Sequence, residues 1–240
     1  MNVVLLAAGL GSRLGALTRD LPKALISVGG KPLLAHALGF AASLRPSRIV
    51  VVGGFCFSLV QEALAPLRGD LPAELVENTR FRDGNLVSLL AAKPLVREGF
   101  LVMNVDHIYR PAIAQVVAPE VERVTAFIDT DRKLGDDDMK VERDREGHVV
   151  AIAKTLTTFD CGYVGMTRVP TAMLGRYWEE ADRALAEEGR AIHVERILAR
   201  LAKTATPPVC RDISGHGWLE VDTPDERTAA ERALASSSWA

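Results

Sequence analysis

The chain has 240 residues and a formal net charge of −2, with 48% hydrophobic and 25% charged residues. This composition excludes an intrinsically disordered chain, and the near balance of charge argues against a nucleic-acid binder that depends on a large basic surface. The length suits one large α/β domain. Three widely separated cysteines without a CxxC pair indicate neither a disulfide framework nor a zinc site.

The apolar start of the chain, MNVVLLAAGLGSRLG, lacks the basic segment of a secretory signal. No apolar stretch reaches the roughly 18 residues that a membrane-spanning helix needs. We therefore expect a cytoplasmic protein from a reducing compartment.

Strand and helix patterns alternate through the first half of the chain. Strands are predicted over 3–7, 49–52, 74–77 and 100–105, and helices over 32–43, 57–64 and 85–92. Pro32 suits the first turn of its helix, and Gly53 and Gly54 close the second strand. Because parallel strands require crossover connections, this order predicts a doubly wound, mostly parallel sheet.

The second half of the chain has a different pattern. Four strands without intervening helices are predicted over 124–129, 139–142, 149–154 and 163–166, with Gly147 in a turn between two of them. Helices at 171–188 and 192–202, a strand at 218–221 and a helix opened by Thr223 and Pro224 follow. We expect a single mixed α/β domain over 1–240 with an added β layer.

The most informative segment is the glycine-rich loop after the first strand, LLAAGLGSRLGALTRDLPKAL at 5–25. Gly9 and Gly11 let backbone N–H groups approach an anion closely, and Arg13 and Lys23 add two cations. These features suit a triphosphate, which carries about three to four negative charges. A glycine turn with a purely structural role is the alternative.

Two common phosphate-binding motifs do not fit this loop. The Rossmann GxGxxG pattern and the P-loop GxxxxGK[ST] pattern both require a glycine where this chain has Leu14. The strand that ends at Gly53 and Gly54 also lacks the acidic residue that dinucleotide binding requires. A dehydrogenase is therefore disfavoured.

The same segment resembles the signature of the nucleotidyltransferases that activate sugar phosphates and alcohol phosphates. The matching residues follow a GxGxRx(n)PK pattern: Gly9, Gly11, Arg13, Pro22 and Lys23. The likeness continues at VVGGF (51–55), ENTRFRDGNLVSL (77–89), VMNVDHIY (102–109) and WLEVDTPDE (218–226), and so covers nearly the whole chain. Among the branches, the chain most resembles the CTP:inositol-1-phosphate cytidylyltransferases, through DDDMKV (136–141), AKTLTTFDCGYVGM (153–166) and WLEVDT.

The resemblance implies a Rossmann-like nucleotidyltransferase fold in which 1–120 mainly binds nucleotide and 121–240 mainly binds the acceptor. It implies a Mg²⁺-dependent enzyme of phospholipid biosynthesis that joins CTP and myo-inositol 1-phosphate, giving CDP-inositol and pyrophosphate. The alternatives are a phosphocholine cytidylyltransferase, a UTP- or dTTP-dependent sugar-1-phosphate enzyme, and a non-catalytic nucleotide-binding regulator. Related enzymes often carry a fused membrane transferase, and we expect that activity to belong to a separate protein.

Two distant aspartates are candidate metal ligands. Asp106 follows one buried strand and Asp222 follows another, so both carboxylates meet at the ligand-binding edge of the sheet if these strands are neighbours. Two carboxylates with phosphate and water oxygens suit Mg²⁺, and the resemblance assigns these aspartates to the metal. A turn residue at Asp106 and a helix-cap neighbour at Asp222 are the alternatives.

The implied reaction needs no general base. A phosphate monoester has its second pKa near 6, so the attacking phosphate is mostly dianionic at pH 7. The site must instead position and neutralise two anions. Arg13 and Lys23 are expected to hold the triphosphate, Lys154 is expected to meet the acceptor phosphate, and Lys140 is the second candidate for that role. A solvated lysine is the alternative for both Lys154 and Lys140.

Nucleotide binding is expected at the glycine loop, at the second strand end and on one helix. The predicted residues are Leu6, Ala7, Ala8, Gly9, Gly11, Ser12, Gly53, Asn85 and Ser88. The resemblance assigns Asn85 and Ser88, which share one helix face, to the nucleoside. A helix N-cap is the alternative for Asn85.

Carboxylates dominate the predicted acceptor half. The candidates are Asp136, Asp160 and Glu220, with Asp137 and Asp138 beside the first. They suit the hydroxyls of a polyol, whereas choline would favour an aromatic cage and aromatic residues make up only 5% of the chain. A solvated acidic turn is the alternative for residues 136–138, and no role is assigned to His107.

Overall fold

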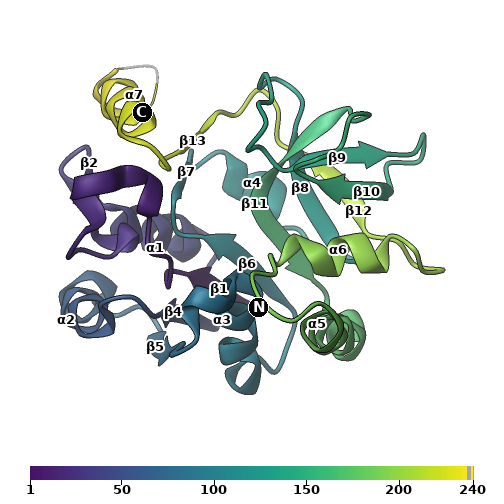
Figure 1. Ribbon diagram of the computed structural model, residues 1–240, viewed down its shortest axis with the longest axis horizontal. Helices are drawn as coiled ribbons and strands as arrows, with labels where there is room; N and C mark the ends of the chain where they lie inside the picture. The colour runs from purple at the N-terminus through teal and green to yellow at the C-terminus, as the bar shows by residue number, and fades with distance from the viewer. Residues whose placement is uncertain (237–238, 240) are drawn as a thin grey trace.

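The described residues, 1–236 and 239, form a nine-stranded mixed sheet in this computed structural model (Figure 1). Its strands are β1 (Asn2–Leu6), β4 (Arg48–Gly53), β5 (Ala73–Glu77), β6 (Phe100–Asn104), β8 (Thr125–Asp129), β9 (Lys140–Arg143), β10 (Val149–Ala153), β11 (Cys161–Val169) and β12 (Val209–Asp212). The main order is β10-β9-β11-β6-β1-β4-β5, with β8 beside β11 and β12 beside β8. Strands β6, β1, β4 and β5 run parallel and β11 is antiparallel to β6, so the predicted doubly wound mixed sheet is confirmed.

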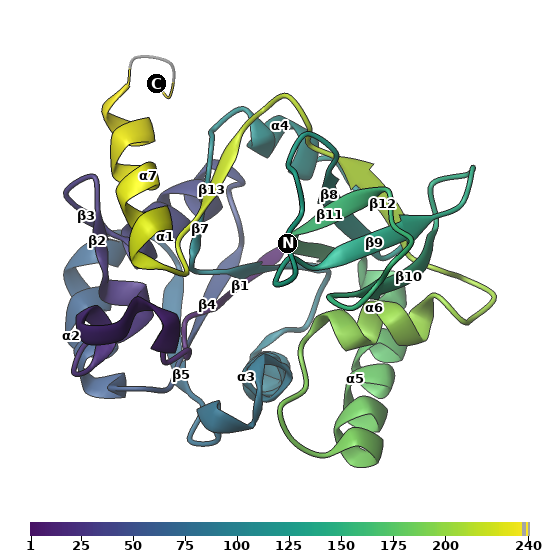
Figure 2. The same cartoon turned by 45° about the horizontal axis from the view of Figure 1, so that its top comes forward.

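Helices cover both faces of this sheet (Figure 2). They are α1 (Leu33–Ser43), α2 (Phe57–Arg68), α3 (Asn85–Ala92), α4 (Ile113–Val117), α5 (Leu174–Glu188), α6 (Glu195–Leu201) and α7 (Pro224–Ala235). Side chains of α1, α2 and α4 pack on one face, and those of α3, α5 and α6 on the other. Every residue of β1 is buried, which explains why this strand is a continuous apolar run rather than an alternating one.

Several short elements differ from their predicted bounds. Pro32 ends the two-residue strand β3 (Lys31–Pro32), which pairs with β2 (Ser27–Val28), and it caps α1 instead of occupying the first turn. The strand predicted at 163–166 is the middle of the longer β11, and α2 continues past residue 64 to Arg68. The elements α4, β7 (His107–Tyr109) and β12 were not predicted, because runs of three to five residues give little periodic signal.

A small ladder beside the main sheet joins two segments that are distant in sequence. Strand β7 follows β6 after a turn at Asp106, and it pairs antiparallel with β13 (Trp218–Glu220). The backbone N–H of Val221 donates to the Asp106 carbonyl at 3.0 Å. Helix α7 then begins with the predicted Thr223 cap, and the Glu226 carboxylate accepts hydrogen bonds from the backbone N–H groups of Asp222 and Thr223. Both aspartates are therefore placed by backbone hydrogen bonds.

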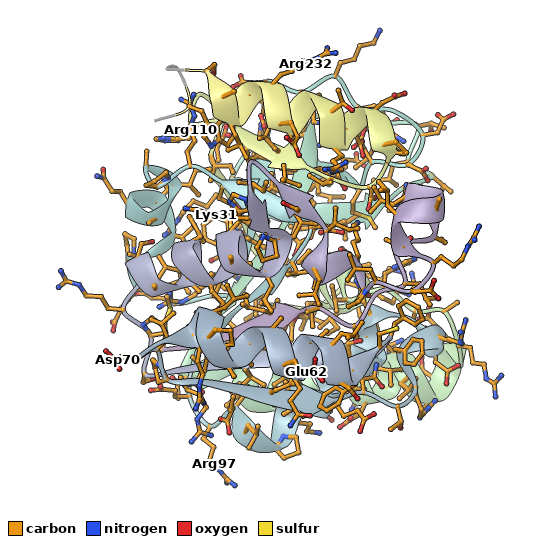
Figure 3. All side chains as sticks on the ribbon, turned by 90° about the vertical axis from the view of Figure 1, so that its left-hand side faces the viewer. Lys31, Glu62, Asp70, Arg97, Arg110 and Arg232 are labelled. Carbon is orange, nitrogen blue, oxygen red and sulfur yellow. The ribbon has the colours of Figure 1, made fainter. Side chains whose placement is uncertain are left out.

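Figure 3 shows the side of the molecule on which α2 and α7 lie. Glu62 on α2, Asp70 after it and Arg232 on α7 point away from the body of the protein. Among the described residues, no helix combines the length and the apolar character that crossing a bilayer would require.

Candidate active site

The glycine loop after β1 lines a cavity of about 530 Å³. Gly11 has a φ of 65°, and a Cβ atom there would lie 2.9 Å from Thr18 Cγ2 and 3.0 Å from Lys23 Cβ. Only glycine therefore fits at this position without strain. Thr18 Oγ1 donates to the Gly11 carbonyl at 2.8 Å, which fixes the loop against the segment that carries Lys23.

Most of the predicted nucleotide-binding residues line this cavity. They are Leu6, Ala8, Gly9, Gly11, Ser12, Asn85 and Ser88. The other two predicted residues, Ala7 and Gly53, lie outside its lining. Ala7 is fully buried in the core, and Gly53 makes room for Phe57, because a Cβ atom there would lie 2.9 Å from Phe57 Cδ2.

Asn85 and Ser88 also hold the cavity wall in place. Asn85 Oδ1 accepts a hydrogen bond from the Val194 backbone N–H at 2.8 Å, and Ser88 Oγ accepts one from Asn78 Nδ2 at 2.9 Å. Asn85 is the first residue of α3 rather than its N-cap. The two side chains thus connect α3 to the segment before α6 and to the end of β5.

Asp106 and Asp222 meet at the buried ammonium group of Lys23. Lys23 Nζ lies 2.5 Å from Asp106 Oδ2 and also contacts Asp222 Oδ1. Arg13 contacts Asp222 as well, and its Nη1 lies 2.9 Å from Asp137 Oδ2. The structure therefore brings together the two predicted metal ligands and the two predicted triphosphate-binding cations.

The environment of Asp106 keeps its carboxylate charged. Burial disfavours the charge, but Lys23 and His107 outweigh burial and hold the pKa of Asp106 well below its ordinary value. His107 Nδ1 lies 2.7 Å from Asp106 Oδ1. An ionised carboxylate beside a second one from Asp222 offers the hard oxygen ligands that Mg²⁺ prefers, so the residues present fit this metal.

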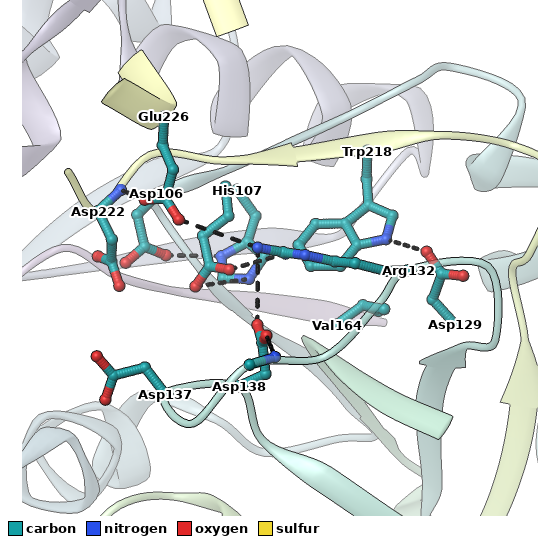
Figure 4. A network of polar contacts seen from close by, with 12 residues as sticks. Asp106, His107, Asp129, Arg132, Asp137, Asp138, Val164, Trp218, Asp222 and Glu226 are labelled. Atoms are coloured by element: carbon teal, nitrogen blue, oxygen red, sulfur yellow. Dashed lines mark hydrogen bonds and ion pairs between the residues drawn. The ribbon is translucent and has the colours of Figure 1, made fainter. Parts of the chain in front are cut away.

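His107 belongs to a stack of flat side chains beside the two aspartates (Figure 4). Its ring stacks on the ring of Tyr109, at a centroid distance of 5.8 Å, and on that of Trp218, at 5.1 Å. The Arg132 guanidinium lies 4.9 Å from the centre of the Trp218 ring, and its Nη1 is 2.9 Å from Glu220 Oε2. Sequence reasoning gave His107 no role because its partners Trp218 and Glu220 lie more than 100 positions away along the chain.

A second cavity of about 210 Å³ adjoins the larger one. The residues shared by both linings are Arg13, Asn85, Asn104, Asp106, His193 and Asp222. The predicted acceptor residues Lys154 and Glu220 line the smaller cavity, together with Asp137 and Asp138. Lys154 Nζ lies 3.7 Å from Asp137 Oδ1. The paired aspartates therefore stand where the two cavities join.

Three predicted acceptor residues, Lys140, Asp160 and Asp136, lie outside both linings. Lys140 is buried, and its Nζ donates to the Lys154 carbonyl at 2.7 Å. Asp160 accepts a hydrogen bond from the Arg143 backbone N–H at 3.1 Å and forms an ion pair with the same residue. Asp136 is exposed in the turn before β9, where it is solvated.

Several lining residues were missed by sequence reasoning. They include Phe81, Arg82, Asn104, Tyr163, His193 and Glu195. Asn104 could have been found, because it precedes Asp106 by two residues, close to the period that places strand residues on one side. His193 and Glu195 gave no such signal, since their position depends on the packing of residues 191–194 against α3.

Residues 3–204 match the family described as the MobA-like NTP transferase domain. The chain is 28% identical over 241 residues to the bifunctional IPC transferase and DIPP synthase of Aquifex aeolicus, covering 99% of this chain and 52% of that protein. It is 28% identical over 247 residues to the CMP-5'-(3-aminopropyl)phosphonate synthase of Streptomyces rubellomurinus, covering 96% of this chain and 38% of that protein. The chain thus spans about half or less of the length of these curated relatives.

The fold is also found among solved structures. The inositol-1-phosphate CTP transferase from T. maritima superposes with a TM-score of 0.81 at 20% identity, covering 98% of this chain and 96% of that one. The likeness includes the mixed sheet and the helices on both of its faces. On the extent of the matched residues, the chain belongs to the family of MobA-like NTP transferase domains.

Proposed function

We propose that the protein is a Mg²⁺-dependent cytidylyltransferase that joins CTP and inositol 1-phosphate to give CDP-inositol and pyrophosphate. The observation that carries this proposal is the meeting of two cavities at Asp106 and Asp222, whose carboxylates both contact Lys23. A nucleotide in the larger cavity and a phosphate monoester in the smaller one would face each other at this point. The resemblance to inositol-1-phosphate cytidylyltransferases supports the choice of substrates.

In the proposed reaction, an oxygen of the acceptor phosphate attacks the α-phosphorus of CTP. A new phosphorus–oxygen bond forms, the bond between the α-phosphorus and its bridging oxygen breaks, and pyrophosphate leaves with the electron pair. No proton has to be removed, because the acceptor phosphate is mostly dianionic at pH 7. The residues therefore act by positioning and by neutralising charge.

Five side chains of this protein supply the polar contacts that the proposal needs. Arg13 and Lys23 would bind the triphosphate beside the glycine loop, and Lys154 would bind the acceptor phosphate in the smaller cavity. Asp106 and Asp222 would hold Mg²⁺, which when bound supplies positive charge between the two phosphates. The paired aspartates and Lys23 are buried enough to exclude much of the water that would screen these charges.

The product of this reaction is an activated diester of diphosphate, with a phosphoanhydride bond, whose consumption requires a second transferase. We propose that a membrane-bound transferase of phospholipid biosynthesis uses it. The name of the Aquifex aeolicus relative, a bifunctional IPC transferase and DIPP synthase, supports this coupling of two activities.

A substrate panel tests the proposed function. The purified protein is incubated with Mg²⁺, each of CTP, UTP, dTTP and ATP, and each of inositol 1-phosphate, phosphocholine and glucose 1-phosphate, and pyrophosphate release is measured. The highest kcat/KM is expected for CTP with inositol 1-phosphate. A higher kcat/KM for another pair of nucleotide and acceptor would contradict the proposed substrates. Absence of pyrophosphate release with every pair would overturn the proposal that the protein is an enzyme.

Asp106→Asn is the matching variant. It keeps the shape of the side chain but removes the charge that would bind metal, so kcat is expected to fall by about a hundredfold or more. Asp182→Asn is the control, because Asp182 is an exposed residue of α5 that pairs with Lys93. Equal turnover by the two variants would remove Asp106 from the mechanism.

A further inference from the structure

Glu195, the first residue of α6, occupies a fixed position at the wall of the smaller cavity. The segment before it is anchored to α3 by two hydrogen bonds. Val194 donates its backbone N–H to Asn85 Oδ1 at 2.8 Å, and the Leu86 backbone N–H donates to the Ile192 carbonyl at 3.1 Å. The backbone that carries Glu195 is therefore held against α3.

This carboxylate is buried and incompletely paired. Glu195 is 7% exposed, and within the described residues its Oε2 atom has no hydrogen-bond partner. Burial raises the pKa of Glu195, against the opposing effects of its own backbone N–H, His193 and Lys154. A buried carboxylate oxygen without a donor is unfavourable, and the cost is removed when a ligand supplies one.

The other carboxylates of the smaller cavity already have partners in the protein. Asp106 and Asp222 contact Lys23, Asp137 contacts Arg13, Asp138 accepts from the Gly135 backbone N–H, and Glu220 pairs with Arg132. Glu195 also borders a neighbouring cavity of about 360 Å³, which shares Met139, Lys154, His193 and Glu195 with the smaller one. Space for the body of an acceptor molecule therefore lies beside the Glu195 residue.

We propose that Glu195 Oε2 accepts a hydrogen bond from a hydroxyl group of the acceptor and thereby selects polyol phosphates. This inference rests on the proposed function, and it names the protein group that recognises the part of the acceptor other than its phosphate. An acceptor without a hydroxyl at this point leaves the carboxylate oxygen unpaired, which is the situation in which a site discriminates strongly. A quaternary ammonium has no N–H to offer, and Tyr163 is the single Phe, Tyr or Trp among the described residues that line the smaller cavity.

The proposal is tested by comparing wild type and a Glu195 variant with the substrate and with analogues that each lack one hydroxyl. Wild type and Glu195→Met are assayed with inositol 1-phosphate and with its monodeoxy analogues, each lacking one hydroxyl. Wild type is expected to lose roughly ten- to a hundredfold in kcat/KM with the one analogue that lacks the contacted hydroxyl. Glu195→Met is expected to lose a similar factor with inositol 1-phosphate itself and almost nothing further with that analogue, because the two changes remove the same contact.

Two further variants separate recognition from folding. Glu195→Gln keeps a carbonyl oxygen and is expected to retain more acceptor discrimination than Glu195→Met. Glu179→Met changes an exposed carboxylate of α5 that pairs with Arg183, and it is expected to match wild type throughout. The KM for CTP is expected to stay within about twofold in all variants.

The outcomes distinguish this inference from the proposed function. An unchanged acceptor KM in Glu195→Met, or equal losses for CTP and acceptor, would overturn the role of Glu195. Wild type that is inactive with inositol 1-phosphate but active with glucose 1-phosphate would overturn the proposed substrate only, and the same cycle is then run with deoxy sugar phosphates. Turnover with phosphocholine alone would overturn the selection of polyols.

Discussion

Two lysines of the acceptor half show how burial separates residues of one chemical type. Lys140 is buried, and its Nζ donates a hydrogen bond to the Lys154 carbonyl. Lys154 lines the smaller cavity, and its Nζ lies 3.7 Å from Asp137 Oδ1. A lysine held loosely by one carboxylate can turn to an incoming phosphate, while Lys140 fixes the backbone that carries it. Lys140 therefore supports the backbone of Lys154, whose proposed role is to bind the acceptor phosphate.

Lys154→Met is expected to raise the KM for the acceptor by about tenfold and to leave the KM for CTP within about twofold, since one charge-assisted hydrogen bond to phosphate is lost. Steady-state kinetics with each substrate varied in turn measures this split. Lys203→Met is the control, because Lys203 is an exposed lysine beyond α6. Parallel increases in both KM values would contradict a role at the acceptor phosphate.

At the scale of residues, the sequence predicted the site residues that belong to a local motif. It missed the residues whose place in the site depends on a tertiary contact. Asp106 and Asp222 each follow a strand, so their approach could be anticipated from the positions of strand ends. Asp160 also lies at the end of a loop before a strand, but its carboxylate forms an ion pair with Arg143. No local pattern reports such a partner 17 positions away.

At the scale of elements, the ladder of β7 and β13 determines the geometry of the site. It sets Trp218 opposite Tyr109 and Glu220 opposite His107, and each strand adjoins one of the paired aspartates. Arg132 reaches this ladder from the segment between β8 and β9, where it contacts Trp218, Glu220 and Asp138. The strand at 218–221 was predictable from its apolar pattern, but the three-residue β7 was not.

Arg132→Met tests whether this contact holds the segment 130–139 over the smaller cavity. The change is expected to reduce the free energy of unfolding by about 1 kcal/mol, from the lost ring contact and ion pair, and to raise the acceptor KM several-fold. Urea unfolding and acceptor kinetics measure the two effects. Arg183→Met removes the ion pairs of an exposed arginine on α5 with Glu179 and Glu180, and Glu180 keeps its pair with Arg200, so stability is expected to change by less than about 0.5 kcal/mol. Equal effects of the two variants on stability and on the acceptor KM would argue against a role of Arg132 in holding the segment 130–139.

At the scale of the whole molecule, one cluster of buried side chains joins the first and second halves of the chain. A single cluster of buried side chains contains Val4 and Val50 from the first strands and Ile152 and Ile197 from β10 and α6. The alternation of strands and helices made the first half of the fold predictable. The second half was less so, because β11 contacts β6, β8 and β9, and strand partners of this kind are set by packing rather than by local pattern.

The same continuity makes Glu195 a determinant of global stability. Burial raises the pKa of this carboxyl above its ordinary value of 4.5, so the folded protein binds the proton more tightly than the unfolded chain does. Stability is therefore lost as pH rises from 4.5 through the raised pKa, and the full cost is present above it. The cost is roughly 1.4 kcal/mol for each pH unit between the two pKa values.

Glu195→Gln removes this titration and is expected to be more stable than wild type at pH 8, with the difference shrinking as the pH approaches 4.5. Urea unfolding of both proteins across this range measures the difference, and titrations of other groups are common to both and cancel. A buried carboxylate that lowers the stability of the folded protein is expected where it is needed to bind a substrate, because stability and function then compete at one residue. A difference that does not change with pH, or a less stable variant at pH 8, would mean that the buried carboxylate is already compensated within the folded protein.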